Sequence, residues 1–244
     1  MILVGCCGWP ERRDAYVAVF PVVELQHTFY QLPSERLAER WRSSVPPGFE
    51  FAIKAWQAIT HRAASPTYRR LREPLAGNRE RYGAFQPSPE VDVAWERTLA
   101  VARVLGASTV VCQCPASFTP SDEHVENLRR FFAVAPRDGL RPVWEPRGGA
   151  WDATLVGELC AELDLVHGVD PFVTALVHGD IAYFRLHGIG GYRYRFTDDD
   201  LHRLVGWCRD ALGANWKAVY VLFNNIAMLA DARRFLALTA QSSW

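Results

Sequence analysis

The sequence predicts an α/β fold, a single TIM-like (β/α)8 barrel formed by all 244 residues. Eight short apolar runs alternate with segments of helical periodicity, and nearly every run ends in a polar or charged residue. Parallel strands need crossovers of about a dozen residues, which the helical segments supply. No G-x-G-x-x-G or P-loop motif supports the competing open, nucleotide-binding sheet. We therefore expect one domain, residues 1–244, with an insertion at 62–100 after the third strand.

The elements follow from the apolar runs and from the capping residues between them. The expected strands are, in chain order, 2–7, 22–26, 49–54, 108–115, 140–146, 165–171, 181–188 and 218–225. The expected helices are 11–20, 35–45, 93–104, 121–135, 154–163, 198–212 and 228–238. Ser34, Ser121 and Thr197 are expected to cap the helices that they precede. Insertions as long as 62–100 are often binding lids, with surface decoration as the alternative.

The composition excludes several classes of protein. The formal net charge is zero and the pI is near 7.0, so no global field favours nucleic acid or an anionic membrane. The six cysteines lie mostly in apolar segments without C-x-x-C spacing, which indicates reduced core thiols. No run approaches membrane-spanning length and the start lacks a basic leader, so we expect a cytoplasmic protein with no membrane partner.

The strand ends carry the strongest chemical signal, because the carboxyl ends of barrel strands form the face where active sites lie. The residues at these ends are, in order, Gly8 and Trp9, Glu24 and Gln26, Lys54, Gln113, Glu145 and Arg147, Asp170, Arg185 and His187, and Asn224 and Asn225. The opposite strand ends begin with plain residues such as Ile2, Val22 and Ile181. This asymmetry predicts one catalytic-looking mouth.

Four of these residues are catalytic candidates. Glu24 and Glu145 could form an acid/base pair, or each could orient a neighbouring cation. Lys54, one of only two lysines in the chain, could form a Schiff base, hold an anionic group, or pair with Glu24. His187 could transfer a proton, or be a structural histidine.

Other residues are candidates for substrate binding. Arg185 and Arg147 could clamp an anion, and Arg185 shares a strand face with His187. His61 could add a second imidazole or merely cap a turn, and the amides of Asn224 and Asn225 could bind substrate or close the barrel. Flat apolar walls, or ordinary packing, are expected from Trp9, Tyr30 and Trp151.

Six segments occur in an order that resembles a known family. They are GCCGWP, VELQHTFYQLP, FEFAIKAWQAITH, VWEPRGGAW, YFRLHG and VLFNN, and together they span almost the whole chain. The chain resembles the domain of unknown function 72 (YecE-like) family, which implies a TIM-like barrel and leaves the activity open. The sequence departs from the family pattern at Gln26-His27, where the family usually has Asn-Ser, and at Gly148, where it commonly has His.

A metal site is not expected, nor is a cofactor. Glu24, Glu145, Asp170, His61 and His187 are suitable ligand types. However, three cations, those of Lys54, Arg147 and Arg185, end strands at the same mouth. Such positive charge favours an organic or phosphate anion over a divalent ion.

Three functional hypotheses follow. The first is a metal-independent enzyme, a hydrolase or lyase, that acts on a small anionic, phosphorylated or sugar-like substrate by Glu/His acid-base chemistry. The second is a metal-dependent nucleic-acid phosphodiesterase or DNA-repair-type protein, with the Arg/Tyr-rich stretch 62–82 as its binding patch. The third is a ligand-binding barrel without turnover. The neutral net charge makes nucleic acid possible but not favoured.

Overall fold

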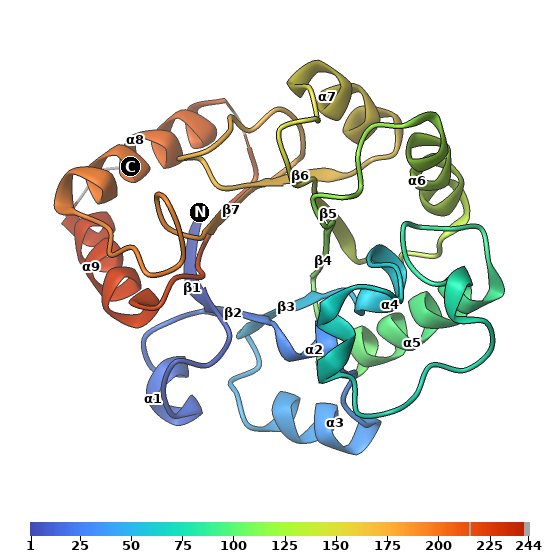
Figure 1. Cartoon of the computed structure of the whole chain (residues 1–244). Helices are drawn as coiled ribbons and strands as arrows, with labels where there is room; N and C mark the ends of the chain where they lie inside the picture. The colour runs from blue at the N-terminus through green and yellow to red at the C-terminus, as the bar shows by residue number, and fades with distance from the viewer. Residues whose placement is uncertain (215, 242–244) are drawn as a thin grey trace.

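The chain folds into a closed barrel. The structure, a computed structural model, describes residues 1–214 and 216–241. Eight strands pair in parallel and in chain order, and the last closes onto the first. Figure 1 shows the strands around the centre of the molecule and the helices outside them. The predicted (β/α)8 barrel is confirmed.

The strands coincide with the apolar runs and stop up to two residues before the predicted carboxyl ends. They are β1 (Ile2–Cys7), β2 (Val22–Leu25), β3 (Glu50–Lys54), β4 (Thr109–Gln113), β5 (Arg141–Glu145), β6 (Val166–Val169), β7 (Ala182–Leu186) and β8 (Val219–Phe223). The polar residues just beyond these ends therefore belong to the loops of the barrel mouth.

The α-helices and 3-10 helices (η) between the strands include all seven that the sequence predicted. The structure has α1 (Arg13–Val17), α2 (His27–Tyr30), α3 (Glu35–Ser43), α4 (Gln57–Thr60), η1 (Pro66–Arg70), η2 (Arg79–Arg81), α5 (Pro89–Leu105), α6 (Asp122–Val134), α7 (Ala153–Glu162), α8 (Asp198–Gly213) and α9 (Met228–Gln241). Ser34, Ser121 and Thr197 cap α3, α6 and α8 as expected. Within the described residues, no helix is both long and apolar enough to span a bilayer.

The boundary between the irregular segment after β3 and the helix that follows it differs from the prediction. Helix α5 starts at residue 89, four residues before the expected start, because Ser88 caps it and a proline occupies its first turn. Residues 89–100 are therefore part of the crossover helix, which packs against α3 and α4. The preceding residues, 61–88, form an irregular excursion, and its return is fixed where Gly83 N donates to Ala58 O over 2.8 Å. Closure of this excursion over the mouth stays a prediction.

Alternate residues of each strand point into the barrel, as the two-residue period of a strand requires. The interior holds small and branched side chains such as Ala52, Val111 and Val143, which are fully buried. Tyr183 and Tyr220 stack there with ring centroids 5.4 Å apart. The other face of the strands packs against the helices in a larger apolar layer. Polar groups at the carboxyl end thus lie on a closed apolar base.

Two short helices that the sequence did not predict shape the mouth. Helices α2 and α4 follow β2 and β3 directly, and each has only four residues, too few to show a helical period. Thr28 Oγ1 donates to Lys54 O over 2.6 Å and to Leu25 O over 2.8 Å, which ties α2 to both strand ends. This contact places the side chain of Phe29 beside Lys54.

Candidate active site

Arg185, on β7, lies in the barrel mouth and is fully buried. Its Nε and Nη2 atoms donate to Glu24 Oε2 and Oε1 over 2.8 and 2.7 Å. Its Nη1 donates to Oε2 of Glu145, on β5. A guanidinium is planar and permanently charged, which suits it to bind one carboxylate with two parallel bonds while reaching another. Arg185 therefore pairs with two carboxylates from distant parts of the chain.

Glu24 has no oxygen left to serve a substrate. Besides the two bonds from Arg185, Oε2 accepts from Tyr183 Oη over 3.0 Å, and Oε1 accepts from Gln26 Nε2. The residue is fully buried. Four donors occupy the lone pairs of an ionised carboxylate. This geometry corresponds to the alternative in which Glu24 orients a cation, and that cation is Arg185 rather than Lys54.

Glu145 is also fully engaged. Its Oε1 accepts from Arg147 Nη2 over 2.6 Å and from Gln113 Nε2 over 3.2 Å, while Oε2 faces Arg185. Burial alone would raise the pKa of Glu145, but the charges of Arg185 and Arg147 outweigh it and lower the pKa to about 2. Glu145 is therefore an anion at neutral pH and positions cations rather than donating a proton.

Lys54 ends β3 beside this network without joining a carboxylate. Its Nζ donates to Gln113 Oε1 over 2.5 Å and lies 4.0 Å from the centroid of the Phe29 ring. In the described part of the chain, no carboxylate oxygen lies within 4.0 Å of Nζ, because Arg185 takes both Glu24 and Glu145. Burial, followed by the charge of Arg185, lowers the pKa of Lys54 to about 8.

His187, one residue beyond β7, contacts Arg147. Arg147 Nη2 lies 2.7 Å from His187 Nε2. Because an arginine can only donate, Nε2 is the acceptor and the proton of the neutral ring is on Nδ1. Nδ1 lies 3.7 Å from Asp170 Oδ2, which also accepts from the backbone N–H of His187 over 2.8 Å. Asp170 therefore anchors the backbone of His187, and its carboxylate lies near the ring without a hydrogen bond to it.

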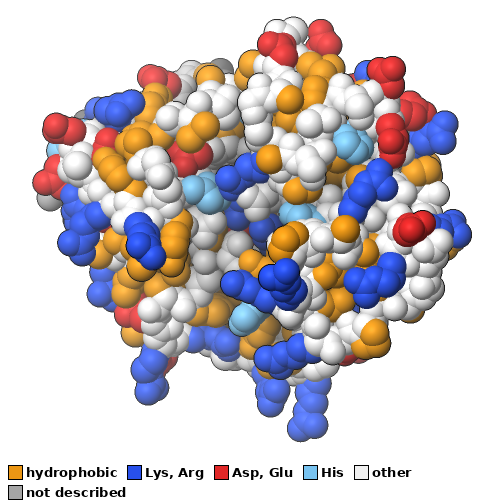
Figure 2. Space-filling view, in the orientation of Figure 1, with side chains coloured by type: hydrophobic (Ala, Val, Ile, Leu, Met, Phe, Trp, Pro, Cys, Tyr) orange, Lys and Arg blue, Asp and Glu red, His pale blue; other side chains and the backbone are white. Residues whose placement is uncertain are grey.

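A cavity of 620 Å³ opens above this group of side chains. Figure 2 shows Lys, Arg and His side chains around a hollow near the centre of this face, while most Asp and Glu side chains lie near its edge. The cavity is formed by the ends of β5 and β6 and by the glycine-rich loops after β5 and β7. Its polar lining consists of Glu145, Arg147, His167, Asp170, Thr174 and His187.

Three more predicted residues lie at the mouth. His61 packs edge-on against Phe29 with ring centroids 4.8 Å apart, and burial together with the charge of Lys54 lowers its pKa to about 4. Trp151 lines the cavity and donates to Phe118 O over 2.7 Å. The ring of Tyr30 contacts Phe29, with centroids 4.9 Å apart. These rings form the apolar part of the rim.

Other predicted residues are placed differently. Trp9 belongs to an aromatic cluster with Tyr16 and Phe49 and does not line the cavity. Asn225 is buried, and its Nδ2 donates to Tyr194 O and to an oxygen of Asp231, so it ties the loop after β7 to α9. The backbone N–H of Asn224 donates to Leu186 O and closes the barrel there. The structure does not bring these three residues to the cavity.

Gln113 and Tyr183 belong to the hydrogen-bonded group at the mouth, but the sequence reasoning named Gln113 only as a strand-end residue and did not name Tyr183. Gln113 links Lys54 to Glu145. Tyr183 lies two residues before Arg185 on β7, so both side chains point into the barrel. This two-residue strand period could have identified Tyr183 from the sequence. Asp170 was noted only as a ligand type, because its backbone partners cannot be read from a sequence.

The donor set does not suit a divalent metal ion. Among the described residues, no three His, Cys, Asp or Glu side chains are placed to share one ion. The oxygens of Glu24 and Glu145 already accept from arginines. A bound cation would have to displace a guanidinium from each of them.

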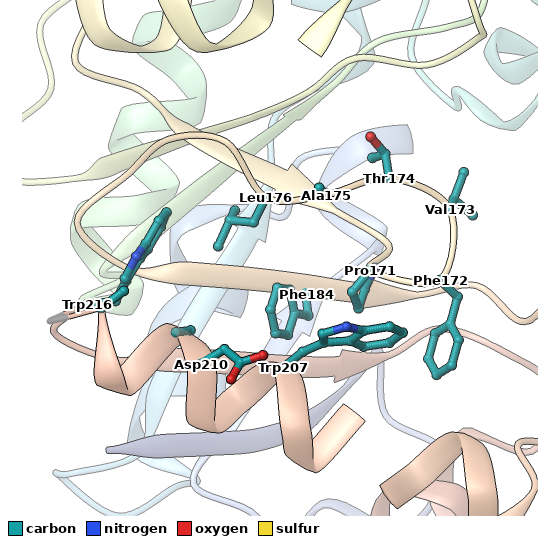
Figure 3. Close-up of a pocket in the computed structure, with 12 residues that line it drawn as sticks. Pro171, Phe172, Val173, Thr174, Ala175, Leu176, Phe184, Trp207, Asp210 and Trp216 are labelled. Carbon is teal, nitrogen blue, oxygen red and sulfur yellow. The ribbon is translucent and has the colours of Figure 1, made fainter. Parts of the chain in front are cut away.

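A second cavity, of 410 Å³, lies outside the barrel between α8 and the link after β6. Figure 3 shows Phe184, Trp207 and Trp216 on its wall, together with the carboxylate of Asp210. The described residues that line it are predominantly apolar, and Asp210 is the one charged side chain among them. The chemistry-bearing residues are therefore those of the mouth.

Comparison with known proteins places the chain in a family. The family described as "Protein of unknown function DUF72" matches residues 4–243. The chain belongs to the DUF72 family. It is 24% identical to the UPF0759 protein YunF of Bacillus subtilis (strain 168), with 97% of this chain and 83% of YunF covered. The structure of a DUF72 family protein from Thermotoga maritima MSB8 superposes with a TM-score of 0.73 at 22% identity, covering 98% and 99% of the two chains.

More distant barrels share the fold of this DUF72 protein. D-allulose 3-epimerase from Methylomonas sp., solved in complex with D-allulose, has a TM-score of 0.59 at 12% identity, covering 99% of this chain and 97% of the epimerase. Endonuclease IV from Thermus thermophilus has a TM-score of 0.56 at 12% identity, covering 98% and 100%. At these identities the likeness concerns the fold alone, which carries unrelated chemistries.

Proposed function

We propose that this DUF72 protein is a metal-independent enzyme that acts on a small anionic substrate in the 620 Å³ cavity. One observation carries the proposal: Arg185 covers the buried carboxylates, so the groups left facing the cavity are chiefly Arg147 and His187. Arg147 is one-third exposed, and its buried Nε has no hydrogen-bond partner among the described residues. A partly exposed guanidinium that lines a cavity suits a phosphate or carboxylate.

His187 is the proton-transfer group in this proposal. Its Nε2 accepts from Arg147. When a substrate anion takes over the Arg147 donors, Nε2 is free to accept a proton from the substrate and to return it, as a neutral imidazole does. Asp170 anchors the backbone of His187 throughout. This assignment suits elimination or hydrolysis of a phosphorylated or sugar-like molecule.

The second titratable group is Lys54 rather than a glutamate. Glu145, with a pKa near 2, lacks a proton to donate at neutral pH, whereas a lysine with a pKa near 8 can donate or accept one. Gln113 and Glu145 connect Lys54 to Arg147 through successive bonds of 2.5, 3.2 and 2.6 Å. His187 lines the cavity and is the group that contacts the substrate in this proposal, and Glu145 holds Arg147; Lys54, which is not among the lining residues, is the titratable group next to this site.

The test is a turnover screen on protein that has been pretreated with a chelator. The candidate substrates are small sugar phosphates and carboxylated sugars, and NMR detects their conversion. We expect one substrate class to be turned over without added metal. We also expect His187→Gln to reduce kcat by about 100-fold or more, as removal of a general base does. Arg147→Gln should mainly raise KM. Turnover that requires added Mn²⁺ or Mg²⁺, or cleavage of DNA in place of small molecules, would favour the phosphodiesterase hypothesis.

A further inference from the structure

The chain's two lysines occupy opposite environments. Lys217 has a side chain that is 73% exposed and pairs with Asp180 over 3.2 Å. Lys54 is only 8% exposed and donates to a neutral amide oxygen, that of Gln113. An ammonium group has three donors and favours a carboxylate partner, whereas a neutral amine needs fewer partners. The surroundings of Lys54 therefore give it a larger fraction of neutral amine than an ordinary lysine has, because its pKa is lowered to about 8.

Lys54 has no carboxylate partner among the described residues because the nearby glutamates at the barrel mouth are paired with arginine. Two glutamates lie on strands of the same barrel, but Arg185 occupies both, with three hydrogen bonds. The Arg185 charge also acts on the lysine directly and helps to lower the pKa of Lys54 to about 8. The side chain is further held between Gln113 and the face of Phe29. A desolvated amine beside another cation is the arrangement that activates a lysine as a nucleophile.

We propose that Lys54 forms an imine with a carbonyl group of the substrate, so that the substrate is an aldehyde or ketone that also carries an anionic group. The anionic part of this statement rests on the proposed function; the imine rests on Lys54 alone. Lys54 and Arg147 lie at the two ends of the chain of hydrogen bonds through Gln113 and Glu145. Lys54 is not among the residues that line the 620 Å³ cavity, so the carbonyl of the substrate has to reach into the barrel mouth beyond that lining while its anion stays at Arg147.

The step is balanced without any co-reactant. The neutral Nζ attacks the carbonyl carbon, a C–N bond forms, and the C=O π bond breaks to give a carbinolamine. Proton transfers to the oxygen then release one water molecule and leave a protonated imine. Counted from the ammonium form, one carbonyl and one ammonium give one iminium and one water, with the charge unchanged. Hydrolysis is the reverse and returns the amine.

Reductive trapping tests the proposal on the whole chain. The protein is incubated at pH 7.5 with glyceraldehyde 3-phosphate and cyanoborohydride, and peptides are identified by mass spectrometry. Reduction of the imine adds the mass of the aldehyde less one oxygen atom. We expect Lys54 to be labelled at least ten times faster than Lys217, although Lys217 is far more exposed. Equal or slower labelling of Lys54 would overturn the proposal.

Two controls make the result independent of any single variant. Lys217→Arg should keep the Lys54 label, and Lys54→Arg should lose it. Because Lys54→Arg could disturb the mouth, the wild-type protein is also labelled in urea, where unfolding should remove the preference for Lys54. A preference that persists in the unfolded chain would reflect local sequence and would contradict an active-site amine.

Neutral glyceraldehyde separates this proposal from the proposed function. If both aldehydes label Lys54 at equal rates, and Arg147→Gln changes neither rate, the imine proposal is supported and the anion site at Arg147 is contradicted. If phosphate binds through Arg147 but neither aldehyde labels Lys54, the anion site stands and the imine fails. Faster labelling by the phosphorylated aldehyde, reduced by Arg147→Gln, supports both.

Discussion

A single guanidinium, that of Arg185, holds the carboxylates of Glu24 and Glu145 in the barrel mouth. Burying three charged groups is costly, and the arrangement is tolerated because each charge has a partner. The same pairing leaves Lys54 without a carboxylate and keeps Glu145 ionised. The sequence analysis considered a pair between Lys54 and Glu24. The partner that prevents it lies 161 residues after Glu24, so local sequence could not reveal it.

Removing the guanidinium should be severely destabilising. Arg185→Met leaves two buried carboxylates facing each other, and we expect the free energy of unfolding to fall by about 3–5 kcal/mol in urea denaturation. Arg12→Met is the matched control, because Arg12 is exposed and its one ion pair among the described residues is with Asp14, and it should leave the stability nearly unchanged. Equal effects of the two substitutions would contradict the central role of Arg185.

Removing Lys54 should stabilise the protein at neutral pH. The pKa of Lys54 is lowered from 10.5 to about 8, so the unfolded chain binds more protons between these values and wild-type stability falls as pH drops from 10.5 to 8. Below pH 8 the full penalty applies, roughly 3 kcal/mol at 1.36 kcal/mol per pKa unit. We expect Lys54→Met to be more stable than wild type at pH 6, and the difference to shrink by pH 10.5.

Urea denaturation at several pH values measures this difference. The charged groups that act on Lys54, those of Arg185, Glu145, Glu24 and Arg147, remain in the variant. Lys217→Met serves as the control, since Lys217 is exposed. A Lys54→Met curve that runs parallel to wild type across the whole range would show that Lys54 titrates as an ordinary lysine.

The elements around the mouth were predictable where the sequence carries a local signal. Strand positions followed from apolar runs, and helix starts at Ser34 and Ser121 followed from capping residues. Helix α2 was missed because four residues carry no period, and α5 was predicted to start too late because Ser88-Pro89 was not taken as a capped start. Strand order placed Lys54, Glu145 and His187 on one face, but which of them touch depends on side-chain geometry.

The conformation of the loop between β7 and α8 requires a glycine at position 188. Gly188 has a φ of +92°, and an added Cβ would lie 2.5 Å from Gly191 O. Gly188→Ala should therefore lower the free energy of unfolding by about 1–3 kcal/mol and shift the adjacent His187, which weakens anion binding. Gly206→Ala, in α8 with open space around it, should stabilise by roughly 0.5–1 kcal/mol. Urea denaturation and phosphate titration of both variants check this, and unchanged phosphate binding in Gly188→Ala would contradict a role for the loop.

The molecule as a whole combines zero net charge with an uneven charge distribution. Positive and imidazole side chains surround the central hollow of the face in Figure 2, and acidic side chains lie mostly at its edge. The barrel provides this arrangement because all eight strands point the same way and bring their polar ends together. The composition shows that the net charge is zero, but only the folded structure shows that positive and negative side chains are separated on the surface.

The measurement that tests the account most directly is a crystal structure of untreated protein grown with a small sugar phosphate, with elemental analysis of the same sample. We predict an anion within hydrogen-bond distance of the Arg147 guanidinium and close to His187, with Arg185 still bound to Glu24 and Glu145. Stoichiometric metal held by Glu145, Asp170 or His187, or an anion bound only outside the mouth, would contradict the account.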